Sequence, residues 1–307
     1  MTLPVSEEVA QRALHRAVNR LRDEDPTRSA AVAVVGWQRA VLWAMLIVTV
    51  GFVIWRPLQT TVVLIAFCTL AYVLTMIDRV VIFRQGLAYP AVVISDEEAR
   101  AIPDTRLPRY TILVPAYNEP EVVGDLLSAM ARLEYPPDKM QVLLLLEADD
   151  QVTIEAARGH EDSEIITIVL VPPAEPRTKP KACNYGLEFA TGDIVTIYDA
   201  EDIPEPLQLR RTVAAFAMLP PEVVCIQSKL AYHNAHQNLL TGWFTAEYNL
   251  WFGYLLPGMM RSASQGAFNI LSATSTDNDD SDYGGTYNKD TIDKKVRLVV
   301  TIEYGID

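Results

Sequence analysis

The chain carries two long stretches without a charged residue in its first quarter. The first runs from Ala40 to Trp55 and the second from Thr60 to Ile77, with residues 56–59 between them. A helix needs about 20 predominantly apolar residues to cross a bilayer, with about 17 as a minimum. Counted with their flanks, both stretches reach that length, so the pattern predicts a transmembrane helical hairpin over residues 37–84. The alternative left open is a helical hairpin buried in the core of a soluble protein.

The residues before the hairpin have the spacing of an amphipathic helix. Between residues 5 and 23, Ala10, Leu14, Val18 and Leu21 recur at helical intervals, with acidic residues early and arginines late. That order of charges suits the helix dipole. We therefore expect a cytosolic N-terminal helix within residues 1–36, lying on the protein or on the membrane surface.

Positive charge around the hairpin predicts its orientation. Several arginines precede the first stretch, Arg79 and Arg84 follow the second, and the turn holds only Arg56. Because cytoplasmic flanks carry the excess of basic residues, both ends of the hairpin are expected in the cytoplasm. This predicts a multi-pass protein of the cell inner membrane or plasma membrane, with the following domain in the cytoplasm.

From residue 105 onward the pattern changes to short apolar runs alternating with helical segments. Strands are expected at residues 110–114, 142–146, 165–171, 193–198 and 223–227, and helices at residues 121–133 and 207–217. Alternation of buried strands with helices is typical of a parallel α/β sheet. Ligands of open parallel sheets bind beyond the carboxyl ends of the strands, so the residues there are the candidates for chemistry.

Acidic or polar residues follow three of these strands. The clusters are Pro115–Glu119 (PAYNE), Glu147–Asp150 (EADD) and Asp199–Asp202 (DAED). Each alone would suit a solvated loop or a helix cap. Together at equivalent strand ends they predict a shared site, and gathered carboxylates repel one another unless a cation lies among them. Their hard oxygen ligands suit Mg²⁺ or Mn²⁺, usually shared with substrate phosphates.

A basic segment precedes the third acidic cluster. Arg177, Lys179 and Lys181 lie immediately before or within an expected helix start. Lysines beside the free backbone NH groups of a helix N-terminus are suited to bind a diphosphate. A solvated basic loop is the alternative for this segment alone.

Composition narrows the choice of partners. The 307 residues are 50% hydrophobic and carry a net charge of −13, which argues against a nucleic-acid role on a basic surface. The three cysteines, Cys68, Cys183 and Cys225, have no CxxC spacing, which indicates neither a disulfide framework nor a zinc site.

These motifs together resemble the family 2 glycosyltransferases, in particular the membrane-bound cellulose synthase-like branch. The matching pieces are VPAYNE, LLLLEADD, TKPKACNYGL, YDAEDIPEP and the run from Gln227 to Gly258. Their order and spacing are more specific than any piece alone, and the resemblance covers about half of the chain. It implies a GT-A (Rossmann-like) fold over residues 105–260, holding the donor half of an inverting, metal-dependent enzyme.

The resemblance also implies roles for individual residues. Tyr117 and Glu119 would lie near the base and ribose, and an acid among Glu147, Asp149 and Asp150 would contact the same part of the nucleotide. Lys179, Lys181 and Asn184 would flank the diphosphate, and Asp199 would take part in donor binding. Asp199 and Glu201 would replace the family's Asp-x-Asp motif and bind Mg²⁺ or Mn²⁺. The implied partners are a nucleotide-sugar donor, expected to be a UDP-sugar, a polysaccharide or lipid-linked acceptor, and the lipid bilayer.

Residues 261–307 depart from the family pattern. They contain neither the acidic motif that carries the general base nor a Gln-x-x-Arg-Trp motif, so the catalytic residues are unassigned. The segment is rich in Ser, Asn, Asp and Gly and predicts a loop or disorder, with one strand at residues 295–304. Two other functions stay open: a catalytically inactive nucleotide-sugar-binding or assembly subunit, and a nucleotidyltransferase on a similar sheet.

Overall fold

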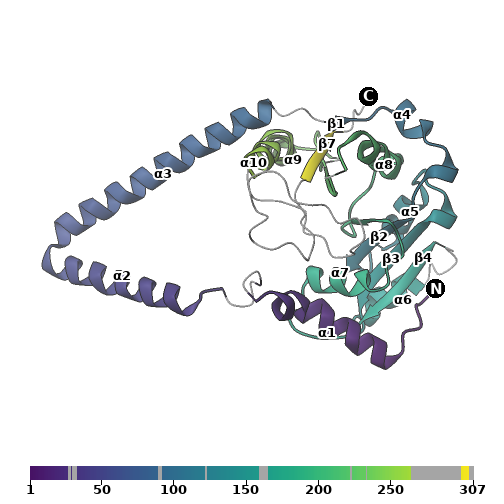
Figure 1. Ribbon diagram of the computed structural model, residues 1–307, viewed down its shortest axis with the longest axis horizontal. Helices are drawn as coiled ribbons and strands as arrows, with labels where there is room; N and C mark the ends of the chain where they lie inside the picture. The colour runs from purple at the N-terminus through teal and green to yellow at the C-terminus, as the bar shows by residue number, and fades with distance from the viewer. Residues whose placement is uncertain are drawn as a thin grey trace. The chain divides into compact units, whose positions relative to one another are not determined.

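The chain divides into two compact units. The computed structural model describes residues 1–26, 29, 33–88, 92–121, 123–158, 165–221, 223–232, 234–263 and 299–303. The first unit combines Met1–Ala31 with Asp96–Ala214, and the second combines Val32–Ser95 with Ala215–Asp307. The first unit is therefore built from two chain segments that the apolar helices separate in sequence. Figure 1 labels most of the helices and strands of both units.

The first unit contains a four-stranded parallel sheet. Its strands are β2 (Tyr110–Ala116), β3 (Met140–Glu147), β4 (Ile166–Val171) and β5 (Ile194–Ile197), in the order β4-β3-β2-β5. Every residue of β2 is buried, and so is all of β3 except Gln141. Strands covered on both faces have this near-continuous apolar sequence. The predicted α/β class and four of the predicted strands are confirmed.

Helices cover both faces of the sheet. Ile112 and Leu144 point into a core shared with α5 (Val123–Ala131), α6 (Gln151–Arg158) and the start of α8 (Gln208–Met218). Leu113 and Leu143, one position along each strand, point into a second core on the other face. That core is shared with α1 (Glu7–Glu24) and α7 (Lys179–Leu187). Three short helices complete the unit: α4 (Asp96–Ala101), η1 (Asp104–Arg106) and η2 (Pro137–Lys139).

The N-terminal residues are part of the first unit. The Leu3 backbone NH donates to the Ile168 carbonyl at 2.8 Å, and the Ile168 NH donates to the Met1 carbonyl at 2.9 Å. These bonds place the first residues beside the outer strand β4. The helix expected between residues 5 and 23 is α1, and its apolar face packs on the protein. The prediction left open whether this helix lies on the protein or on the membrane surface, and the structure supports a position on the protein.

The second unit contains the two apolar helices, α2 (Gly36–Trp55) and α3 (Pro57–Leu87). Both are long and apolar enough to cross a membrane, and neither buries any of its most apolar stretch within the protein. This exposure argues against the alternative of a soluble helical core. The predicted break over residues 56–59 was too long: only Arg56 separates the helices, since Pro57 is well tolerated in the first turn of a helix.

The remaining strands form a separate sheet in the second unit. β1 (Val92–Val93), β7 (Val299–Glu303) and β6 (Cys225–Ser228) pair in parallel in the order β1-β7-β6. The expectation that residues 223–227 join the main sheet was wrong, because β6 pairs with a strand from the end of the chain. That strand, β7, lies within the segment 295–304 where one was predicted. The rest of the tail expected to be a loop, residues 264–298 and 304–307, lies outside the described residues.

Three helical segments of the second unit follow β6: α9 (Leu239–Leu250), a π-helical turn η3 (Trp251–Leu255) and α10 (Leu256–Ala263). Two glycines mark where α3 meets this helical run. A Cβ added at Gly258 would lie 2.0 Å from the Ile82 carbonyl oxygen, and one at Gly86 would lie 1.8 Å from the Tyr254 carbonyl oxygen. The backbones therefore touch directly at two places.

We expect Gly258→Ala to destabilise the second unit by about 1 to 3 kcal/mol, because the added methyl overpacks this contact. Gly51→Ala is the matched control, since no atom lies within 4 Å of a Cβ added there. Thermal unfolding in detergent measures both variants. Equal midpoints for the two variants would contradict the close packing of α3 on α10.

Candidate functional site

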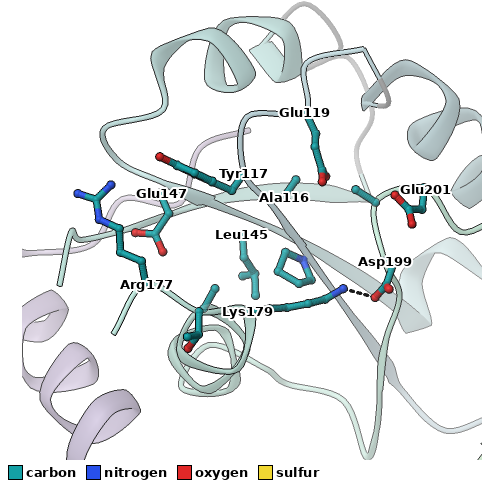
Figure 2. A pocket seen from close by; sticks show the side chains of 13 residues that line it. Ala116, Tyr117, Glu119, Leu145, Glu147, Arg177, Lys179, Asp199 and Glu201 are labelled. Atoms are coloured by element: carbon teal, nitrogen blue, oxygen red, sulfur yellow. Dashed lines mark hydrogen bonds and ion pairs between the residues drawn. The ribbon is translucent and has the colours of Figure 1, made fainter. Parts of the chain in front are cut away.

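A pocket of about 410 Å³ opens at the carboxyl ends of β2, β3 and β5. The start of α7 forms another of its walls, as Figure 2 shows. All of its residues belong to the first unit. It is lined by Pro115, Ala116, Tyr117, Glu119, Leu145, Glu147, Arg177, Thr178, Lys179, Ala182, Asp199, Ala200 and Glu201. The three strand-end clusters and the basic segment predicted from the sequence thus meet at one edge of the sheet.

The loop after β2 is held by partly buried hydrogen bonds. Asn118 has φ 56°, a left-handed conformation that Asn tolerates better than most residues. Its backbone NH donates to Asp150 Oδ2 at 2.6 Å, and the Glu119 NH donates to Thr153 Oγ1 at 3.1 Å. The exposed Tyr117 and the Glu119 side chain are thereby set at the pocket.

Asp150 has a different role from the predicted nucleotide contact. It is 8% exposed and is not among the residues lining the pocket. Besides Asn118, it accepts a hydrogen bond from the Thr153 NH at 3.2 Å at the start of α6. Burial alone would raise the pKa of Asp150, but the hydrogen bonds from Asn118 and Thr153 outweigh it and lower that pKa. The carboxylate fixes the backbone beneath Glu119, because only an acceptor can satisfy these NH groups.

This gives a pH-dependent prediction for Asp150→Asn. A carboxyl whose folded pKa is lowered stabilises the fold above its unfolded pKa, and that stabilisation is lost as pH falls through the lower folded value. At pH 7 we expect the variant to cost about 1.5 to 3 kcal/mol, the range for hydrogen bonds to a charged group. The difference should shrink below pH 3.8, the ordinary pKa of the group. Denaturant unfolding at several pH values measures it, and a difference independent of pH would contradict the assignment.

The acids after β3 are engaged by two basic residues. Glu147 lines the pocket and pairs with Lys181, with Nζ 2.7 Å from Oε1. Asp149 pairs with Arg177 at 2.7 Å between NH2 and Oδ2. The pKa of Arg177 is raised by the hydrogen bond and charge of Asp149, and by a hydrogen bond with Tyr117. Asp149 does not line the pocket itself, but it pairs with Arg177, which does.

Lys181 and Asn184 do not take the places predicted for them beside a diphosphate. The Lys181 side chain is 1% exposed, and its ammonium also donates to the Ala174 carbonyl at 3.2 Å. Asn184 Nδ2 donates to the Ala17 carbonyl of α1 at 3.2 Å. Neither lines the pocket. Residues 179, 181 and 184 project in different directions because successive helical residues turn by about 100°.

Lys179, Asp199, Glu201 and Glu119 are four of the charged residues that line the pocket. Lys179 begins α7 and its ammonium pairs with Asp199, which follows β5. The pKa of Glu119 is raised, first by burial and then by the charge of Glu201, with Asp199 adding to it and Lys179 opposing it. The pKa of Asp202 is likewise raised, first by burial and also by the charge of Asp199. The acids outnumber the base at this edge, which gives it a negative potential.

This donor set fits a divalent cation shared with a ligand. Among the described residues, the His, Cys, Asp and Glu side chains form no ready-made group of three metal ligands. Mg²⁺ is commonly held by one or two carboxylates together with substrate phosphates. Asp199 and Glu201 supply two carboxylates on one loop. Burial is the first cause of the raised pKa of Glu119, and the repulsion by Glu201 that adds to it is the part that a cation would relieve.

Sequence analysis named Arg177 only as one charge of the basic segment and Thr178 only within a motif, and the structure places both at the pocket. Thr178 occupies the N-cap position of α7, and Arg177 precedes it. The signal for Arg177 was present, as one of three positive charges before the helix. Its role depends on Asp149 and Tyr117, which come from other loops, and no local pattern reveals that contact.

A sequence profile of the family described as Glycosyltransferase like family 2 matches residues 108–273. The match includes β2 to β6, the whole pocket and the helices up to α10. The chain belongs to this family.

Individual relatives match the same region. The protein named "Probable glycosyltransferase YdaM" of Bacillus subtilis is 28% identical over 143 residues, covering 46% of this chain and 34% of its own length. The Arabidopsis thaliana protein named "Probable glucomannan 4-beta-mannosyltransferase 14" is 29% identical over 155 residues, covering 47% of this chain and 29% of its own length. The chain thus spans about a third of each of these relatives.

Among solved structures, the chain is similar to the mannosyltransferase PcManGT from Pyrobaculum calidifontis in complex with GDP-Man and Mn²⁺. That likeness has 30% identity and a TM-score of 0.40, over 49% of this chain and 41% of the other. A TM-score this low carries no argument about the arrangement of the two proteins. Family membership agrees with the parallel sheet, and with the GT-A type of fold expected from the motifs.

Proposed function

We propose that this chain is the donor-binding part of an inverting glycosyltransferase that works at the cytoplasmic face of a membrane. It would bind a nucleotide diphosphate sugar in the strand-end pocket, for transfer of the sugar to a polysaccharide or lipid-linked acceptor. One observation carries the proposal: a lysine at a helix N-terminus and a group of carboxylates face one another in a pocket of about 410 Å³. Family membership supports the same reading.

The basic side of the pocket suits the diphosphate. The dipole of α7 places partial positive charge at its N-terminus, which favours an anion there, although Pro180 has no NH and the Lys181 NH already donates to the Thr178 carbonyl at 3.0 Å. Lys179 and Arg177 add positive charge beside this N-terminus. Both ion pairs are partly solvent-exposed, with side-chain exposures of 40–55%, so a phosphate can compete for either cation at little cost.

The acidic side of the pocket suits a divalent cation. Asp199 and Glu201 would hold Mg²⁺ or Mn²⁺, which when bound neutralises charge on the departing diphosphate. Tyr117, Arg177 and Asp149 form the rim at the ends of β2 and β3, where we place the nucleoside. A UDP-sugar is the expected donor, and a mannosyl donor is the second to test because relatives are named as mannosyltransferases.

The chain path supports the membrane part of the proposal. The segment with α2 and α3 leaves the first unit after Ala31 and returns to it at Asp96. Both ends of the segment are therefore tied to one folded unit. A unit on one side of a bilayer requires an even number of crossings between those ends, and two helices of sufficient length are present.

Turnover separates this proposal from the alternative of an inactive binding subunit. Full-length protein in detergent is mixed with UDP-sugars or GDP-mannose, Mn²⁺ and candidate acceptors, and release of nucleoside diphosphate is followed. We expect release that Asp199→Ala lowers by about a hundredfold or more, the typical effect of removing transition-state charge stabilisation. Donor binding without release would favour the inactive subunit, and neither binding nor release would contradict both.

A further inference from the structure

Helix α7 sets one wall of the pocket. Thr178, Lys179 and Ala182 line the pocket from its first turns. The buried ion pair between Lys181 and Glu147 connects the same helix to the end of β3. A shift of α7 would therefore move Lys179 relative to Asp199 and change the width of the pocket.

The opposite side of α7 packs on α1. Leu14 and Ala17 of α1 are each 8% exposed and share a core with Cys183 and Tyr185 of α7. Asn184 Nδ2 donates to the Ala17 carbonyl at 3.2 Å. This hydrogen bond comes from one of the residues that the family motif had placed at the diphosphate. Figure 1 shows α1 and α7 side by side.

Helix α1 is itself fixed at its beginning. The backbone bonds of Met1 and Leu3 with Ile168 attach the start of the chain to β4. Residues 1–24 thus form one continuous support, bound to the edge of the sheet at one end and packed along α7 by its helix. In the sequence, residues 1–24 come before the two apolar helices, whereas every residue of the pocket comes after them.

We propose that residues 1–24 are a positioning element for the donor site, which holds α7 and Lys179 at the distance from Asp199 that nucleotide-sugar binding needs. This inference rests on the proposed function. According to this inference, residues 1–24 contribute to donor affinity although none of their side chains lines the pocket. Loosening α1 should weaken donor binding even with every pocket residue in place.

The test compares Leu14→Ala with Leu21→Ala in the full-length protein. Both variants make the same change on α1, but Leu14 is 8% exposed and Leu21 is 55% exposed. Amide exchange is followed in α7, with α5 on the other face of the sheet as the internal reference. For Leu14→Ala we expect exchange in α7 to rise about tenfold relative to α5, and the Kd of the nucleotide sugar to rise about five- to tenfold. Leu21→Ala should change both by less than about twofold.

Two further variants keep the test decisive. Leu14→Met conserves the volume and should restore both readouts. If Leu14→Ala does not fold, Leu14→Val takes its place because it leaves a smaller cavity. A lower thermal midpoint with unchanged donor affinity and unchanged relative exchange in α7 would overturn the inference. An unaltered chain that binds no nucleotide sugar would refute the proposed function, and exchange in α7, which needs no donor, would still decide whether α1 holds α7.

Discussion

Asp199→Ala is expected to weaken Mn²⁺-dependent binding of a nucleoside diphosphate by about a hundredfold, equivalent to about 2.7 kcal/mol. The variant removes one of the two carboxylates that we assign to the cation. It also removes the partner of Lys179. The ammonium then loses its ion-pair partner and is available to a phosphate, so binding measured in EDTA should be unchanged or tighter than in the unaltered chain.

This opposite effect with and without metal distinguishes the assigned role from simple damage to the fold. Asp138→Ala is the control, since Asp138 is an exposed acid of the same unit outside the pocket. It should leave both affinities within about twofold, as for an ordinary surface change. An equal loss of affinity in Mn²⁺ and in EDTA would contradict the assignment of Asp199 to the cation.

Lys181→Met is expected to destabilise the first unit by about 3 to 5 kcal/mol, the cost of leaving one charge of a buried pair without its partner. The Lys181 and Glu147 side chains are 1% and 8% exposed, so water cannot readily replace the lost ammonium. The loss should fall sharply in the double variant Lys181→Met with Glu147→Leu, because a buried ion pair can be replaced by apolar residues of similar volume. Denaturant unfolding measures both.

Lys179→Met is the matched control on the same helix. Its side chain is 43% exposed, so we expect a change in stability within about 0.5 kcal/mol and a clear loss of nucleotide affinity. We thus expect different effects from the two lysines: Lys181 contributes to stability, and Lys179 contributes to nucleotide binding. If Lys181→Met instead reduced nucleotide affinity without changing stability, Lys181 would be the phosphate ligand that the family motif implies.

The sheet and its strand-end clusters were predictable because their signals are local. Runs such as residues 142–146 are apolar throughout, and buried parallel strands show that pattern. The acids and the tyrosine that follow the strands then had to meet at one edge, whichever helices connected them. This is why Tyr117, Glu119, Asp199 and Glu201 could be named before the structure was known.

The places that the structure gives to Lys181 and Asn184 depended on contacts between distant parts of the chain. Lys181 and Asn184 stand in the same motif as Lys179, and nothing in the motif says that one pairs with Glu147 and the other with α1. Likewise, the apolar run of β6 does not reveal that its partner is β7, from the end of the chain. Local sequence pattern indicates which segments are apolar, but it does not specify which distant element packs against them.

The most direct test of the central claim is calorimetric titration of the full-length protein in detergent with UDP-sugars and GDP-mannose, in Mn²⁺ and then in EDTA. We predict saturable binding of one donor at a single site, weakened at least tenfold when the metal is removed. That result would establish the strand-end pocket as a metal-dependent donor site once Asp199→Ala abolishes the metal effect. Absence of binding by every nucleotide sugar, in protein whose unfolding is cooperative, would contradict the proposal that this chain binds a glycosyl donor.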